Sequence, residues 1–442
     1  MHSLKGLVEK NSSIPPHLYD WYNVKRGLRN KDGTGVLVGL TEIGDVHGYV
    51  LDEGEKIPDK GRLRYRGISI QDIVEGFQKD KRSGFEEVVY LLMCGELPSK
   101  ENLVNFNELL ASNYELPNGF WENMILKSPS PDIMNMLARC TLAAYTYDDN
   151  PDDTSLENVL RQCIGLIGQY PTMVAYAYQA KCHYFEGKSL HIHMPLKEGG
   201  HAKNLLHLIR PTNEYTELEA ELLDLALVLH AEHGGGNNSS FTVNVVSSSG
   251  TDTYSSIAAA IGSLKGPRHG GASLRVHTMM QEIKEQVKDW TSEKDVEDYL
   301  AKIIRKEAGD GSGLVYGLGH AIYTKSDPRA VLLKEKASQL AQETGRQEEL
   351  NLYNMVADLT PKVFYDVKGS DKVISPNVDF YSGFVYSMLN IPRELFTPIF
   401  AIARVAGWCA HRLEEMVSNS RIMRPAYRNV AEIEKYIPMD ER

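Results

Sequence analysis

The chain has 442 residues, of which 42% are apolar and 24% are charged, and its formal net charge is −11. The apolar share is sufficient for a buried core, which excludes a chain that is disordered throughout. The negative charge, with no long block of like charges, argues against nucleic acid and anionic membranes as partners. No apolar stretch reaches the about 18 residues that a membrane-spanning helix needs.

The N-terminal segment Met1–Lys10 lacks the apolar core of a secretory signal and has an acidic residue early, unlike a transit peptide. The cysteines are scattered and never spaced as CxxC: Cys94, Cys140, Cys163, Cys182 and Cys409. This pattern is typical of reduced, mostly buried thiols. We therefore expect a cytoplasmic protein.

In chain order, residues 1–35 predict a short helix followed by an arm. Residues 36–66 predict a small sheet, because β-like runs at 36–38 and 49–51 are separated by glycines. Helical patterns then begin at the capping signal Ser69–Asp72, a hydroxyl residue followed three positions later by an acid. Further helices are predicted at 85–93, 134–147, 158–168, 172–185, from Pro211 to His233, and at 254–264, 273–306, 328–345, 346–366 and 394–415.

The predicted fold is therefore mainly α, with a small N-terminal β segment. Charge is denser in the helices after residue 271, and loops rich in glycine and serine follow them. These shifts predict a smaller helical domain at 271–380, inserted between the two parts of a large helical domain, at 1–270 and 381–442.

The segment His230-Ala-Glu-His233 is followed by three glycines, which expose backbone N–H groups to a ligand. On a continuing helix the two histidines would project from nearly one face. A zinc pair is one alternative, although the spacing differs from the HExxH pattern of metalloproteases. Two polar residues satisfied at a helix end are another.

Two further histidines follow glycine-rich turns. His269 lies between Gly-Pro-Arg and Gly-Gly, where the N-terminus of the next helix would lower the pKa of an imidazole. A neutral imidazole can donate a hydrogen bond to a carbonyl oxygen that becomes enolate-like. His320 follows Gly-Leu-Gly, and Arg329 follows an Asp-Pro turn. Arginine binds a carboxylate through two hydrogen bonds while histidine polarises a carbonyl, so this pair suits a keto acid.

Asp379 lies between Val378 and Phe380 beside a proline turn. Partial desolvation there would raise the pKa of the carboxyl toward that of a general base, although an N-cap role is an equal alternative. Arg404 is enclosed by apolar residues and needs an internal carboxylate or a bound anion, unless its side chain reaches the surface. Near the C-terminus, Arg421, Arg424 and Arg428 cluster around Pro425.

Taken together and in chain order, the segments that carry these histidines, arginines and Asp379 resemble the citrate synthase family. The resemblance covers residues of about 60–430. The resemblance rests on Arg-Leu-Arg-Tyr-Arg-Gly67, His-Ala-Glu-His233, Gly-Pro-Arg-His269-Gly-Gly-Ala, Gly-Leu-Gly-His320, Asp-Pro-Arg329, Asn-Val-Asp379-Phe-Tyr-Ser-Gly, Ala-Arg404-Val-Ala-Gly-Trp and Arg424-Pro. It implies a homodimer with the active site in a cleft between the two domains. It also implies condensation of acetyl-CoA with oxaloacetate and hydrolysis of citryl-CoA, the entry step of the tricarboxylic acid cycle.

The resemblance assigns a role to each matching residue. Asp379 removes a methyl proton, His269 stabilises the enolate, and His320 polarises the keto group and protonates the alkoxide. Oxaloacetate carboxylates are held by His233, Arg329, Arg404 and, from the partner subunit, Arg424. No cofactor and no metal are implied, since acetyl-CoA is a substrate.

The sequence departs from the family pattern around the CoA contacts. Ser273-Leu274 replaces an Asn-acid pair, and Thr324 stands where some members have a basic residue. Arg268 and Lys325 are therefore the candidates for CoA binding.

Three other functions stay open on the sequence. A 2-methylcitrate synthase would use propionyl-CoA with the same machinery, since one methylene changes specificity by only about 1–3 kcal/mol. A metal-dependent hydrolase would use His230 and His233 with a distant carboxylate. A non-catalytic protein would bind CoA or a dicarboxylate without releasing a thiol.

Overall fold

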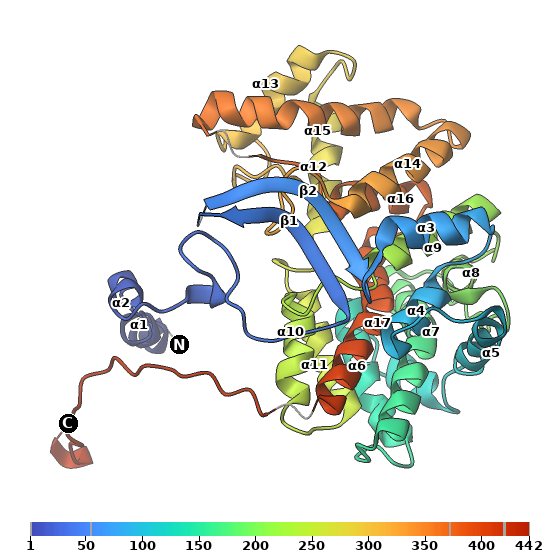
Figure 1. The fold of residues 1–442 in the computed structure, drawn as a ribbon, viewed down its shortest axis with the longest axis horizontal. Coiled ribbons are helices and arrows are strands. Elements are labelled where there is room, and N and C mark those ends of the chain that lie inside the picture. The colour runs from blue at the N-terminus through green and yellow to red at the C-terminus, as the bar shows by residue number, and fades with distance from the viewer. Residues whose placement is uncertain (1, 54, 371–372, 419–420, 442) are drawn as a thin grey trace.

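The computed structural model describes residues 2–53, 55–370, 373–418 and 421–441. Most of them are helical, and the strands lie near the N-terminus (Figure 1). This confirms the predicted mainly α class with a small β segment. Within the described ranges, no helix is long and apolar enough to cross a membrane.

The N-terminal part begins with α1 (His2–Asn11) and α2 (Pro16–Trp21). An antiparallel sheet follows, with β1 (Gly44–Asp52) and β3 (Ile68–Ser69) on either side of β2 (Glu55–Tyr65). The predicted strand at 36–38 is wrong, because this segment is coil, with Leu37 and Val38 exposed. Its apolar residues have no neighbouring strand to pair with in the described chain.

The larger group of helices surrounds the apolar core. It consists of α3 (Ile70–Lys79), α4 (Phe85–Cys94), α5 (Lys100–Ala111), α6 (Ile133–Ala144), α7 (Leu156–Glu186), α8 (Gly200–Ile209), α9 (Glu217–His230), α10 (Asn238–Ser247), α11 (Thr253–Lys265) and α17 (Phe396–Val417). The Ser69 side chain caps α3 by accepting a hydrogen bond from the Gln71 backbone, as predicted.

Helix α7 corrects the two separate helices predicted at 158–168 and 172–185. It runs unbroken for 31 residues with Pro171 inside it. Proline normally disfavours a helix interior. Here the helix is buried on both sides of Pro171, and packing against α6, α8 and α17 outweighs the lost backbone hydrogen bond.

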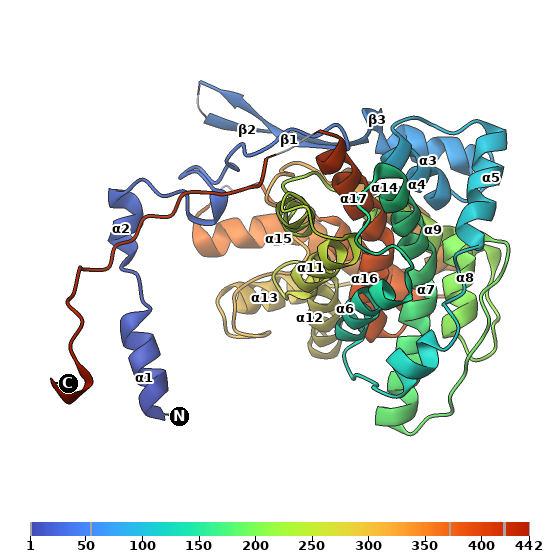
Figure 2. The ribbon, with the colours of Figure 1, turned by 90° about the horizontal axis from the view of Figure 1, so that it is seen from below.

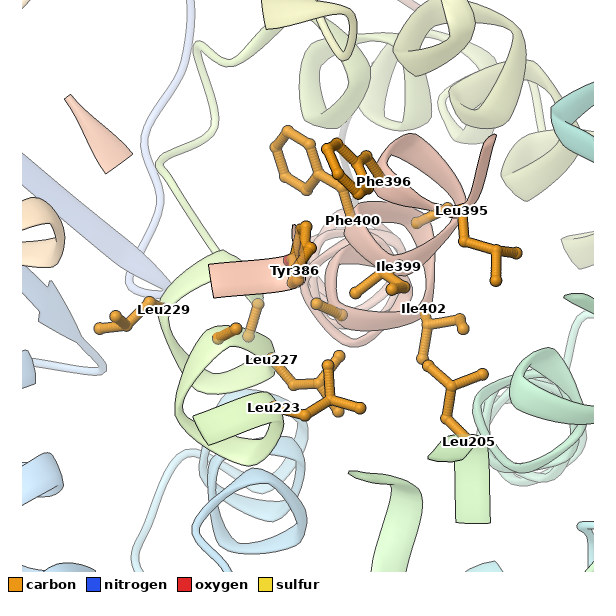
Figure 3. Close-up of a cluster of buried hydrophobic side chains, with 14 of the residues drawn as sticks. Leu205, Leu223, Leu227, Leu229, Tyr386, Leu395, Phe396, Ile399, Phe400 and Ile402 are labelled. Carbon is orange, nitrogen blue, oxygen red and sulfur yellow. The ribbon is translucent and has the colours of Figure 1, made fainter. Parts of the chain in front are cut away.

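Helix α17 lies at the centre of the core. Its segment from Pro398 to Leu413 is buried throughout, as is α9 from Leu222 to His230. Figure 3 shows Ile399 and Ile402 of α17 close to Leu223 and Leu227 of α9 and Leu205 of α8. Arg404, His411 and Arg412 are therefore polar side chains enclosed in an apolar helix bundle.

A second group of helices lies at the top of Figure 1. It contains α12 (Ala272–Gln286), α13 (Glu293–Ile304), α14 (Pro328–Glu343), α15 (Gln347–Lys368) and α16 (Val378–Met388). The range 273–306, predicted as helical, is thus two helices joined by a turn. Helix α14 contacts α9, and α12 contacts α17, so the two groups meet where the sequence places its histidines. The division at residues 271 and 380 stays a prediction.

Both chain ends extend away from the helical body on the same side (Figures 1 and 2). The C-terminal arm, residues 421–441, contains no α-helix. The guanidinium of Arg428 lies 5.3 Å from the ring centroid of Tyr22, the residue that follows α2. Both arms expose large apolar side chains to solvent, among them Leu7, Trp21, Tyr427, Ile433 and Tyr436.

Candidate active site

His233 and His230 occupy different environments, contrary to the predicted shared helix face. Helix α9 ends at His230, so His233 lies in the loop beyond it. The Nδ1 atom of His230 lies 2.7 Å from the Ala226 carbonyl oxygen, and its ring packs edge-on against Phe400. The buried ring of His233 instead packs against His320, with centroids 5.1 Å apart.

His320 has a defined tautomer. Its Nδ1 accepts hydrogen bonds from the backbone N–H groups of Ile322, at 3.0 Å, and Tyr323, at 3.2 Å. Burial, followed by the charge of Arg329, lowers the pKa of His320 to about 4. At neutral pH the ring is therefore uncharged, and its one hydrogen is on Nε2, ready to be donated.

Arg329 lies in the first turn of α14 and is almost completely buried. The Asp327 carboxylate accepts from its Nε at 3.0 Å and from its Nη2 at 2.7 Å. Asp327 also caps α14 by accepting from the backbone N–H of Arg329. This double contact fixes the plane of the guanidinium, and the Asp327 charge raises the Arg329 pKa against the effect of burial.

Asp379 lies in the first turn of α16, and the predicted N-cap alternative is wrong. Asn377 caps the helix, since its Oδ1 accepts from the Asp379 backbone N–H at 3.0 Å. Asp379 is partly exposed, and its hydrogen bonds within the described ranges involve its backbone rather than its carboxylate. Burial raises the Asp379 pKa to about 6, although the charge of Arg329 opposes the shift. A free carboxylate with this pKa suits a general base.

His269 lies in the loop before α12 and contacts Ser239. Its Nε2 is 3.0 Å from the Ser239 hydroxyl oxygen, which also accepts a hydrogen bond from the indole N–H of Trp408. Burial and then the charge of Arg404 lower the His269 pKa to about 4. The ring is therefore neutral at pH 7, and desolvation is the largest cause of its lowered pKa.

Arg404 is fully buried, so the alternative in which its side chain reaches the surface is wrong. Its Nε donates to the His230 carbonyl at 2.7 Å, and its guanidinium lies over the Phe400 ring. Neither Nη1 nor Nη2 has a hydrogen-bond partner in the described chain. Two buried donors without acceptors are costly, and a bound carboxylate would satisfy both.

The charges of the two buried arginines reach several of these groups. The charges of Arg329 and Arg404 act on both His233 and Asp379. Burial is the largest cause of the lowered His233 pKa, and these two charges lower it further. The groups predicted to hold anions, His233, Arg329 and Arg404, are buried. Those predicted to react, His269, His320 and Asp379, are partly exposed. Within the body of the chain, the residues predicted to hold oxaloacetate thus lie deeper than those predicted to react.

The remaining predicted residues lie outside this cluster. Arg268 and Lys325 are exposed on the two loops that carry His269 and His320. Arg424 is exposed in the C-terminal arm, which leaves the body of its own chain (Figure 2).

Sequence reasoning missed several residues that shape the site. Tyr323 is buried, its ring lies tilted against His320 with centroids 4.8 Å apart, and its hydroxyl has no partner in the described ranges. Tyr65 donates from its hydroxyl to the Val228 carbonyl at the end of α9. Ser239 and Asp327 orient His269 and Arg329, as described above. Their positions beside the recognised motifs are the only signal that the sequence offers.

Among the described residues, no group of three or more His, Cys, Asp or Glu side chains could hold a metal ion. This includes the His230 and His233 pair considered for a hydrolase.

Comparisons with known proteins agree on one family. The family described as "Citrate synthase, C-terminal domain" matches residues 32–426. A citrate synthase of Haloferax volcanii is 33% identical over 95% of this chain and 99% of its own length. A 2-methylcitrate synthase of Corynebacterium glutamicum is 31% identical over 95% and 98% of the two chains. The citrate synthase of Thermoplasma acidophilum, solved as a ternary complex with carboxymethyl coenzyme A and oxaloacetate, superposes with a TM-score of 0.76 at 26% identity, covering 95% and 99%.

Proposed function

Because the chain belongs to the citrate synthase family, we propose that it condenses acetyl-CoA with oxaloacetate and hydrolyses citryl-CoA to citrate and CoA. The enzyme is an acyltransferase of the tricarboxylic acid cycle. The observation that carries this proposal is the free carboxylate of Asp379, with its pKa raised to about 6, in a site that also holds two neutral histidines and two buried arginines. This set suits proton abstraction beside an anionic acceptor.

In our proposal, oxaloacetate binds first to the buried groups. Arg404 offers its two free terminal nitrogens to one carboxylate. Arg329, held in plane by Asp327, and His233, whose Nε2 has no partner in the described chain, contact the rest of the dianion. A substrate anion thus satisfies donors that are otherwise buried without acceptors.

Carbon–carbon bond formation then uses the partly exposed groups. The Asp379 carboxylate removes a proton from the acetyl methyl group of the thioester. The Ser239 hydroxyl lies within hydrogen-bond distance of both Asn237 Oδ1 and His269 Nε2, and we assign its proton to Nε2 in the reacting complex. The neutral His269 ring then carries its hydrogen on Nδ1, which we assign to the thioester oxygen. Removing one such donor from an oxyanion costs about 2.7–4 kcal/mol in other enzymes. The hydrogen bond from His269 therefore stabilises the enolate that forms when Asp379 removes the proton.

His320 completes the condensation. Its Nε2–H donates a hydrogen bond to the keto oxygen of oxaloacetate. The deprotonated methyl carbon of the thioester then attacks the keto carbon. The proton on Nε2 passes to the new alkoxide, giving citryl-CoA, and the proton that Asp379 took from the methyl group is returned to His320 before the next turnover. Water then cleaves the thioester, and CoA leaves as a thiol. Closure of the 271–380 domain over the 1–270 and 381–442 domain would exclude water until the carbon–carbon bond has formed.

We further propose a homodimer in which Arg424 of the partner subunit completes the oxaloacetate site. Three observations support it: Arg424 lies outside its own chain's site, the arms extend from the body, and their apolar side chains are exposed. Large exposed apolar surfaces are typical of protein interfaces. The five cysteines are free thiols, which supports a cytoplasmic location.

For CoA, we propose Arg268 and Lys325 as phosphate contacts. Both are exposed on loops that carry a reacting histidine, so each is free to meet a ligand at the open side of the site. Alanine at either position should raise the KM for acetyl-CoA and leave that for oxaloacetate unchanged. An unchanged KM for acetyl-CoA in both variants would refute these contacts.

The alternative donor is propionyl-CoA, because a 2-methylcitrate synthase is about as similar to the chain as the citrate synthases are. The deciding experiment is a thiol-release assay with acetyl-CoA and propionyl-CoA, each with and without oxaloacetate. A citrate synthase should release CoA only when oxaloacetate is present and should have the higher kcat/KM for acetyl-CoA. Thiol release without oxaloacetate would indicate a simple thioesterase instead.

A further inference from the structure

Helix α17 carries a polar stripe that leads away from the oxaloacetate groups. Arg404 and His411 are seven residues apart, which is close to two helical turns and places them on nearly one face. Gly407 lies between them. Glu232, from the loop after α9, packs against this stripe and is fully buried.

Two donors hold the Glu232 carboxylate by a single oxygen. Its Oε1 lies 3.0 Å from His411 Nε2 and accepts from the Gly234 backbone N–H at 2.5 Å. The second oxygen, Oε2, has no hydrogen-bond partner in the described chain. It lies above Gly407, where an added Cβ would come within 2.4 Å of it. The space for this carboxylate therefore exists because residue 407 is glycine.

Arg404 and Glu232 are neighbours of opposite charge that do not pair. Among the ion pairs of the described residues, Glu232 pairs with His411 and not with Arg404. Burial lowers the Arg404 pKa to about 10, and the Glu232 charge is the largest effect that opposes this shift. Glu232 thus supports the charge of the guanidinium from a distance while Nη1 and Nη2 stay unoccupied.

We propose that His411 is a tether that holds Glu232 away from Arg404, so that the terminal nitrogens of the guanidinium stay open to a substrate carboxylate. A buried carboxylate with one unsatisfied oxygen gains by pairing with a nearby buried guanidinium. Such a pair would occupy the donors that oxaloacetate requires. Glu232 and His411 are positioning residues, and this inference rests on the proposed binding of oxaloacetate by Arg404.

The test compares variants at position 411. His411→Leu removes the tether, and we expect the KM for oxaloacetate to rise about tenfold, as when one charge-assisted hydrogen bond to a substrate is lost. The KM for acetyl-CoA should not change. His411→Gln keeps an N–H donor of similar reach and should restore the KM for oxaloacetate. If His411→Leu does not fold, His411→Asn replaces it, because its shorter side chain stays polar but does not reach Glu232.

A double variant separates competition from simple structural damage. Adding Glu232→Gln to His411→Leu removes the competing anion, so the KM for oxaloacetate should fall back to that of Glu232→Gln alone. His201→Leu is the matched control: His201 forms another buried pair, 2.9 Å from Glu86, on helices that carry no residue of the site. This control should lower thermal stability and leave the KM for oxaloacetate unchanged.

The tether is refuted if the double variant has a higher KM for oxaloacetate than His411→Leu, or if His411→Leu raises the KM of both substrates equally. Arg404→Ala distinguishes this failure from failure of the proposed function. If Arg404→Ala leaves the KM for oxaloacetate unchanged, the binding role of Arg404 is wrong. If Arg404→Ala raises it and the position 411 variants do not, only the tether is wrong.

Discussion

The Ser239 hydroxyl oxygen lies 3.0 Å from Nε2 of His269, and these two residues come from α10 and from the loop before α12. The hydroxyl also accepts from the Trp408 indole, which can only donate. Its own proton has two acceptors within reach, Asn237 Oδ1 at 3.0 Å and His269 Nε2. The choice between them decides whether Nδ1 of His269, the nitrogen that we assign to the thioester, carries a hydrogen.

Ser239→Ala should therefore lower kcat more than it changes either KM. The imidazole would lose the partner that sets its tautomer and orientation, and misplacement of a catalytic group costs up to about 100-fold. Steady-state kinetics with both substrates would measure the effect. Ser239→Thr keeps the hydroxyl and serves as the control. An increase in the KM for oxaloacetate with kcat unchanged would place Ser239 in substrate binding instead.

Asp379→Asn should reduce condensation by about 100-fold or more, since general bases contribute about 10²–10⁴-fold. Oxaloacetate binding should persist, because the proposed contacts to this substrate come from Arg404, Arg329 and His233. Thiol release measures the condensation rate, and calorimetric titration measures oxaloacetate binding. Equal loss of both would show that Asp379 has a structural role.

The pH profile should report the same carboxyl. Since burial raises the Asp379 pKa to about 6, kcat/KM for acetyl-CoA should fall about tenfold per unit as pH drops below 6. The carboxyl must lose its proton to act as a base, so activity is present above this pKa and lost below it. His269 and His320, with pKa values lowered to about 4, stay neutral across this range. Activity that instead falls as pH rises through 6 would contradict the assignment.

Subunit mixing should reveal whether Arg424 acts across a dimer. Arg424→Ala and Asp379→Asn homodimers should each be nearly inactive. When the two variants are unfolded and refolded together, some dimers contain one chain of each variant. In such a hybrid, one site has an intact Asp379 and an intact Arg424 of the partner subunit. Activity should then rise well above that of either parent. No recovery in confirmed hybrids would show that Arg424 serves its own chain or neither.

Local signals in the sequence were reliable where a few neighbouring residues decide the outcome. The cap at Ser69 and the helix predicted at 85–93, which the structure ends with Gly95 at a φ of +85°, depend on adjacent side chains and backbone alone. The run at 36–38 has strand composition but forms no strand, since among its residues only Val36 donates a backbone hydrogen bond to another segment, to the Leu28 carbonyl, and Pro171 is accommodated because α7 is packed on several sides. Both outcomes depend on contacts that local propensity does not contain.

The sequence by itself determined the mainly helical class, the order of the motifs and the types of residue available for chemistry. Only the tertiary structure decided that Asn377 rather than Asp379 caps α16, that His233 leaves the face of His230, and that burial sets the pKa values of the reacting groups. The physical reason is distance along the chain. Arg404 contacts His230 across 174 positions, and desolvation at such a contact depends on every element packed around it rather than on its neighbours in sequence.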